Sequence, residues 1–148
     1  MCIRDRITPY LGALPLPDDR GAMKHFLEAL TWHTDHGDCI MIYPEAHIWP
    51  FYTGIRPFPD TSFRYPVQQK LPVFCLTNTY QRREKSHIPQ IVTYLDGPFY
   101  PDAELPAKLQ KTQLRDQVYE AMGKRAQNSN MEMIRYIKKD TDREKSFI

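Results

Sequence analysis

Residues 38 to 47 read Asp-Cys-Ile-Met-Ile-Tyr-Pro-Glu-Ala-His, an apolar run of strand length that ends at a proline and a carboxylate. The apolar centre, residues 40–42, shows no alternation, which is typical of a strand covered by helices on both faces. Pro44 cannot donate to a sheet ladder, so strand pairing should end there. We therefore expect a buried strand that delivers Glu45 and His47 to the edge of an open α/β sheet where ligands bind.

The residues before this run predict a helix that crosses over a sheet. Apolar residues follow the i, i+3, i+4, i+7 spacing of one helix face from Met23 to Leu30. Asp18 and Asp19 offer an N-cap, and Gly37 stands where the helix should end. A brief strand is expected before the helix, over residues 11–17. Because strand, helix and strand follow in order, we expect a βαβ crossover with parallel pairing.

The second half of the chain predicts two more strands and a long helix. Apolar runs at residues 71–77 and 91–95 have strand length, and residues 104–138 are rich in helix formers. We therefore expect a single α/β domain over residues 1–148, with a mixed, mostly parallel sheet flanked by helices and a helical C-terminus. One stripe of the last helix should face the core: Leu114, Val118, Ala121 and Met122.

The composition limits the classes of protein that fit this chain. Lys and Arg number 20 against 18 Asp and Glu, so no strong overall field favours nucleic acid. Cys39 and Cys75 lie in apolar runs, and we expect buried thiols in a reducing compartment. No apolar window reaches the roughly 18 residues of a membrane-spanning helix. These features predict a cytoplasmic protein, either free or peripheral at the inner face of the cell membrane.

An ordered series of short motifs lies within residues 9–80. An apolar segment at Gly12–Leu16 is followed by Tyr43-Pro44-Glu45, by the aromatic segment Phe58–Phe63 and by Leu71-Pro72-Val73-Phe74. In order and spacing, this series resembles the lysophospholipid acyltransferase superfamily, which contains the glycerol-phosphate and 1-acylglycerol-3-phosphate acyltransferases. The resemblance implies a partial glycerolipid acyltransferase fold.

The chain departs from the family pattern at several positions. After Pro-Glu the family has Gly-Thr-Arg, where this chain has Ala46, His47 and Ile48. In the fourth motif, Cys75 replaces the second proline. These departures indicate a divergent, bacterial branch.

The resemblance implies an enzyme of phospholipid biosynthesis that moves a fatty acyl group to a lysophospholipid such as 1-acylglycerol-3-phosphate. The acyl donor would be acyl-CoA or an acyl carrier protein, with no bound cofactor and no metal. The base of that family is the histidine of a His-x4-Asp motif, because the attacking hydroxyl must lose a proton. That motif lies several tens of residues before Pro-Glu. We therefore expect the catalytic pair upstream of Met1, and a chain that is N-terminally incomplete and inactive alone.

Four residues are candidates for binding the acceptor: Glu45, His47, Arg56 and Arg64. An arginine fork suits phosphate oxygens, and the neighbouring prolines stiffen the loop, so Arg56 is the preferred phosphate ligand. Glu45 would accept a hydrogen bond from a glycerol hydroxyl or hold a nearby arginine, and His47 would replace the missing cationic contact. The alternatives are surface salt bridges for the arginines, capping of backbone amides for Glu45 and an exposed loop position for His47.

Two further groups have both a functional and a structural explanation. The basic stretch Gln81–Lys85 would dock an acyl carrier protein, coenzyme A phosphates or anionic lipid, or would be a solvated turn. Aromatic residues among the loop prolines would wall an acyl channel, touch lipid headgroups or pack under the loop: Trp49, Phe51, Tyr52 and Phe58.

Two other functions remain open. The same scaffold would bind lipid or a protein partner without catalysis. A metal-dependent hydrolase would use a cluster at the end of the predicted helix: His33, Asp35, His36 and Asp38. His33 and Asp38 also match the letters His-x4-Asp, but Asp and Gly favour turns and we expect a solvated turn there.

Overall fold

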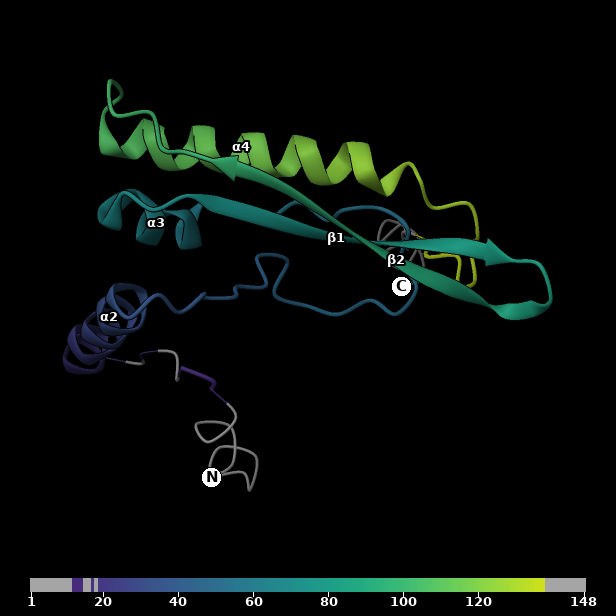
Figure 1. The fold of residues 1–148 in the computed structure, drawn as a ribbon, viewed down its shortest axis with the longest axis horizontal. Helices are drawn as coiled ribbons and strands as arrows, with labels where there is room; N and C mark the ends of the chain where they lie inside the picture. Colours follow the sequence, from purple (N-terminus) through teal and green to yellow (C-terminus); the bar gives the residue numbers. More distant parts are fainter. Residues whose placement is uncertain (1–11, 15–16, 18, 138–148) are drawn as a thin grey trace, which may run out of the picture. The chain divides into compact units, whose positions relative to one another are not determined.

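The computed structural model describes residues 12–14, 17 and 19–137, and the chain divides into two compact units, Met1–Ile42 and Tyr43–Ile148. The first unit contains helix α2 (Arg20–Asp35). The second contains η2 (Thr61–Phe63), α3 (Arg64–Gln69), β1 (Val73–Arg83), β2 (Ser86–Phe99) and α4 (Ala107–Ala126) (Figure 1). The fold is therefore mixed α/β. Within the described ranges, no helix has both the length and the apolarity needed to cross a bilayer.

Helix α2 begins and ends where the sequence predicts. The Asp19 carboxylate accepts a hydrogen bond from the Ala22 N–H at 2.7 Å, as an N-cap does. Gly37 has φ +82°, the left-handed conformation that commonly follows a helix end. The strand expected over residues 11–17 lies partly outside the described residues, and the described residues 12–14 and 17 contain no strand.

The apolar run that follows α2 is not a strand. Residues 39–43 have irregular backbone, and Met41, Ile42 and Tyr43 are 63%, 43% and 78% exposed. Cys39 is also exposed. The predictions of a buried strand, a βαβ crossover and a buried Cys39 thiol are therefore wrong. Local β-propensity does not hold an isolated strand, and the only sheet among the described residues contains β1 and β2 alone.

The sheet is an antiparallel hairpin and not the predicted, mostly parallel sheet. Glu84 and Lys85 alone join β1 to β2, and so short a connection can join only antiparallel neighbours. β2 also continues through Asp96-Gly97-Pro98, although Asp, Gly and Pro are residues that favour turns. Gly97 has φ +125°, and a Cβ there would lie 2.8 Å from the Val73 carbonyl oxygen, so only glycine fits this close approach.

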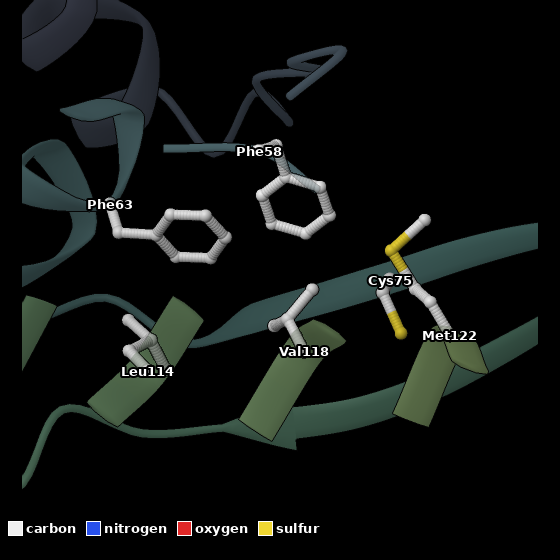
Figure 2. Packing of buried hydrophobic residues seen from close by; sticks show 6 residues of the cluster. All are labelled: Phe58, Phe63, Cys75, Leu114, Val118 and Met122. Carbon is white, nitrogen blue, oxygen red and sulfur yellow. The ribbon is translucent and has the colours of Figure 1, made fainter. Parts of the chain in front are cut away.

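Helix α4 packs along the hairpin and supplies half of the core (Figure 1). Three of the four residues of its predicted apolar stripe are buried, whereas Leu109, off the stripe, is 52% exposed. The buried Cys75 agrees with the sequence prediction. Figure 2 shows the buried cluster, which consists of Phe58, Phe63, Cys75, Leu114, Val118 and Met122.

The hairpin buries threonines on one face and exposes leucines on the other, the reverse of the usual arrangement. Thr77 and Thr79 lie on the buried side and are 1% and 0% exposed. The Thr79 hydroxyl donates to the Val92 carbonyl at 3.0 Å, which satisfies it across the strands. Leu76 and Leu95 pair on the opposite face and are 50% and 63% exposed. The hairpin thus presents an apolar face to solvent.

Candidate functional site

The segment that precedes η2 brings two of the predicted site residues together. Pro44 and Glu45 form a turn, in which the Ala46 N–H donates to the Tyr43 carbonyl at 3.2 Å. Oε2 of Glu45 accepts a hydrogen bond from the backbone N–H of Arg56 at 3.0 Å, across 11 residues of chain. The half-buried Glu45 carboxylate therefore braces the loop at the residue predicted to bind phosphate.

The turn at Ala46 has the geometry of a glycine position. Ala46 has φ +59°, a left-handed conformation that is strained for a residue with a Cβ. The family motif that this segment resembles has glycine at this position. The next N–H, from His47, donates to the Glu45 carbonyl at 2.8 Å, and the His47 side chain is exposed. Glu45 and His47 are therefore presented by one tight turn.

The Arg56 side chain is held over an indole ring. Its guanidinium carbon lies 4.3 Å from the centroid of the Trp49 ring, which is a cation–π contact. Its Nη1 atom is buried and has no hydrogen-bond partner in the described part of the chain. Leaving such a donor unpaired is costly, and an anionic acceptor at this point would satisfy it. Among the residues that the structure describes, none forms an ion pair with Arg56.

Trp49 is itself fixed by two tyrosines. The Trp49 and Tyr136 rings are stacked, with centroids 4.8 Å apart, and Tyr52 meets both rings edge-on. The Tyr136 hydroxyl donates to the Pro50 carbonyl at 2.8 Å, from 86 residues further along the chain. Tyr136 was not among the predicted site residues, because no local sequence pattern links residues so far apart.

The remaining candidates have other surroundings. Arg64 is the first residue of α3, and its guanidinium lies 4.9 Å from the centroid of the Tyr65 ring. Phe58 is 3% exposed within the core, so packing explains it better than an acyl channel does. Phe51 lies against Tyr80, with ring centroids 5.6 Å apart. Glu45 and Arg56 are joined by a hydrogen bond from the Arg56 backbone N–H to the Glu45 carboxylate.

The histidine and aspartate cluster at the end of α2 forms a turn. The His33 side chain lies 2.8 Å from Asp38, Nδ1 to Oδ2, and the two side chains are 37% and 54% exposed. The Asp38 N–H also donates to the His33 carbonyl at 3.0 Å. These contacts confirm the expected turn. In the ranges that the structure describes, no group of three His, Cys, Asp or Glu residues is placed to hold a metal ion. The hydrolase alternative therefore has no support in the geometry.

A second feature, an open cavity of about 550 Å³ between β2 and α4, carries no unbalanced charge. Two ion pairs lie in its lining: Arg125 binds Asp96, and Lys124 binds Glu120 at 2.7 Å. We assign no ligand to this cavity, because its charged groups already satisfy one another.

Comparisons of the chain with protein-family models, with curated protein sequences and with solved structures find no match. The functional argument therefore rests on two observations. One is the motif resemblance, and the other is the arrangement of Glu45, Arg56 and Trp49.

Proposed function

We propose that this chain forms the acceptor-binding part of a glycerolipid acyltransferase, which moves a fatty acyl group from an acyl thioester to a lysophospholipid. One observation carries the proposal. Arg56 stands over Trp49 with an unpaired buried Nη1, while Glu45 fixes its backbone. The left-handed φ of Ala46 adds support, since the family motif has glycine there. In this proposal the fold is a partial glycerolipid acyltransferase fold.

Arg56 would bind the phosphate of the acceptor. Its guanidinium presents paired N–H donors that match phosphate oxygens, and the hydrogen bonds to a charged acceptor are strong. The stacked Trp49 and the Glu45–Arg56 hydrogen bond limit how much side-chain and loop freedom is lost on binding. The phosphate would therefore meet a largely preorganised site.

Glu45 would bind a neutral part of the same acceptor. A carboxylate repels a phosphate, so Glu45 cannot be a direct phosphate ligand. Its Oε1 has no hydrogen-bond partner among the described residues, which leaves it able to accept from a glycerol hydroxyl. Phosphate on Arg56 and hydroxyl near Glu45 would orient the glycerol between them. The proposal assigns no general base to this chain.

Titration calorimetry with a short-chain lysophosphatidate, kept below its micelle concentration, tests the proposal. We expect binding of this ligand and no measurable binding of the matching monoacylglycerol, which lacks the phosphate. Glu45→Ala should weaken binding by about tenfold, because the loop that presents Arg56 loses its brace. Equal affinity for the two lipids would overturn the assignment of Arg56 as a phosphate ligand.

A second assay separates the enzyme from its non-catalytic alternative. The chain is incubated with the same acceptor and acyl-CoA, and the diacyl product is measured. We expect binding without product, because no residue of this chain is assigned as the general base. Product above the acceptor-only control would exclude the lipid-binding alternative, and it would also overturn the assignment of no base to this chain.

A further inference from the structure

Tyr136 lies in the segment that follows α4, and this segment starts from a fixed point on the hairpin. The N–H groups of Asn130 and Met131 both donate to the Tyr80 carbonyl, at 3.0 Å and 3.2 Å. The Asn130 side chain in turn accepts from the Arg82 N–H at 2.6 Å. These contacts tie the start of the segment to β1 and limit where Tyr136 can lie.

Tyr136 makes two different contacts with residues 49–50. Its ring is stacked on the Trp49 indole, with centroids 4.8 Å apart and planes 19° from parallel. Its hydroxyl donates to the Pro50 carbonyl at 2.8 Å. The first contact restricts the side chain of Trp49, and the second restricts the backbone that follows it.

The turn that carries Trp49 depends on such outside contacts. The Tyr52 N–H donates to the Trp49 carbonyl at 3.2 Å, and Phe51, within this turn, has φ +58°. A left-handed conformation is unfavourable for a residue with a Cβ, and it persists where surrounding contacts hold the backbone. The hydrogen bond from Tyr136 acts on the residue directly before Phe51. Tyr136 therefore stabilises a strained turn as well as an indole ring.

Trp49 connects Tyr136 to the candidate phosphate ligand. The guanidinium carbon of Arg56 lies 4.3 Å from the centroid of the Trp49 ring. An indole that was free to rotate would give the guanidinium several positions, and that freedom would be lost when a phosphate bound to one of them. We propose that Tyr136 is a positioning residue of the Arg56 phosphate site, on which it acts through Trp49. This inference rests on the proposed function and adds to its site a residue from far along the chain.

Titration calorimetry with the short-chain lysophosphatidate measures the effect of Tyr136 on binding. Tyr136→Phe should weaken binding by about threefold, because it keeps the ring and loses one hydrogen bond to the turn. Tyr136→Ala should weaken it by about tenfold, since the stack on Trp49 is lost as well. Tyr100→Ala is the matched control, because Tyr100 is 62% exposed and directly follows β2. It should bind the ligand as the unsubstituted chain does.

A double variant separates positioning from a general loss of structure. If Tyr136 acts on Arg56, Tyr136→Ala should weaken binding by less than about twofold in an Arg56→Gln background. An equal loss in both backgrounds would overturn the inference, because Tyr136 would then act elsewhere. Tyr136 is 37% exposed and lies outside the buried cluster, so its truncation should leave the core intact, which circular dichroism checks. Tyr136→Phe carries the same comparison if Tyr136→Ala does not fold.

The fluorescence of Trp49 tests the contact without a ligand. The chain has two tryptophans, so Trp32→Phe leaves Trp49 as the only one. In that background, Tyr136→Ala should shift the emission to longer wavelength and increase quenching by acrylamide, because the indole loses its cover. Tyr136→Phe should change neither. Identical emission and quenching in Tyr136→Ala and its Trp32→Phe parent would overturn the inference irrespective of ligand binding.

The failures of the two proposals are distinguishable by the same titrations. Weakened binding in Arg56→Gln with unchanged binding in Tyr136→Ala would overturn this inference and leave the proposed function standing. Unchanged binding in Arg56→Gln, or no binding by the unsubstituted chain, would overturn both, since Tyr136 would then have no phosphate site to position.

Discussion

Arg125 donates three hydrogen bonds to Asp96, from Nε to both carboxylate oxygens and from Nη2 to Oδ1, at 2.6–3.1 Å. This contact joins the last turn of α4 to β2. Lys111 and Thr112 bind Asp60 at the other end of the helix, at 3.1 Å and 2.9 Å. Helix α4 is therefore fixed at both ends by a carboxylate.

These contacts predict acid sensitivity. The hydrogen bond from Arg125 lowers the pKa of Asp96 below its ordinary value, and those from Thr112 and Lys111 do the same for Asp60. A carboxyl group whose pKa is lower in the folded state than in the unfolded state stabilises the fold at pH values above its unfolded-state pKa. That contribution is lost as pH falls through the folded-state pKa. We expect the free energy of unfolding in urea to fall from about pH 4 downward.

The matched variants are Asp60→Asn and Asp96→Asn. Each should be less stable than the unsubstituted chain at pH 7 and should lose less stability on acidification. A pH profile in the double variant as steep as that of the unsubstituted chain would show that other groups cause the acid sensitivity.

Leu114 is the most deeply buried apolar residue of the described core, at 0% exposed. Leu114→Ala should lower the free energy of unfolding by about 3 kcal/mol, because it removes buried apolar surface and leaves a cavity. Leu109→Ala, on the exposed side of the same helix, should change it by less than about 0.5 kcal/mol. Denaturant unfolding followed by circular dichroism measures both. Similar losses for the two variants would contradict the observed packing of α4.

Ala46 offers a test of backbone strain. Ala46→Gly should raise the free energy of unfolding by about 0.5 kcal/mol, since the relief of the left-handed conformation exceeds the added unfolded-state entropy. Ala103→Gly is the control, because Ala103 is exposed in a turn and does not have positive φ. There the substitution should be destabilising by about 0.5 kcal/mol. A loss of stability in Ala46→Gly would contradict the φ of +59° at Ala46.

The thiols of Cys39 and Cys75 should react very differently. Burial raises the pKa of the Cys75 thiol, and the Asp96 carboxylate raises it further, whereas Cys39 is exposed. In a Cys2→Ser background, we expect one thiol to react with Ellman's reagent in the folded chain and the second to react only in denaturant. Rapid reaction of both thiols under native conditions would contradict the burial of Cys75.

Helices were predictable because their signals are local. The spacing of Leu114, Val118 and Met122 and the cap at Asp19 each lie within a few turns of the chain, and the structure confirms both. Strands depend on distant partners. The apolar run at residues 39–43 has the composition of a buried strand, but it has no neighbour in the described sheet.

The polarity of β1 also misleads a sequence argument. From their apolar character, Phe74 and Leu76 would be expected to face the core, yet both are half exposed. Thr77 and Thr79, which follow them in β1, are buried instead. The Thr79 hydroxyl reaches a carbonyl on the paired strand, whereas the Thr77 hydroxyl is buried without a hydrogen-bond partner among the described residues.

The sequence singled out Glu45 and Arg56 through the motif resemblance and through residue type, because an arginine in a proline-rich loop suits phosphate binding. Their role in binding an acceptor stays a prediction. Glu45 was expected to accept from a glycerol hydroxyl or to hold a nearby arginine, with capping of a backbone amide as the alternative, and its carboxylate accepts from the backbone N–H of Arg56. Loops lack the periodicity that would fix such a contact, and the support from Tyr136 comes from the far end of the chain.

The central claim is that Arg56 binds a phosphate monoester, and calorimetry of one ligand with two variants tests it most directly. The ligand is the short-chain lysophosphatidate, and the variants are Arg56→Gln and the control Lys108→Gln, at an exposed position in the first turn of α4. We predict that Arg56→Gln weakens binding by about 30-fold, through loss of charged hydrogen bonds, while Lys108→Gln binds as the unsubstituted chain does. Unchanged affinity in Arg56→Gln would contradict the claim.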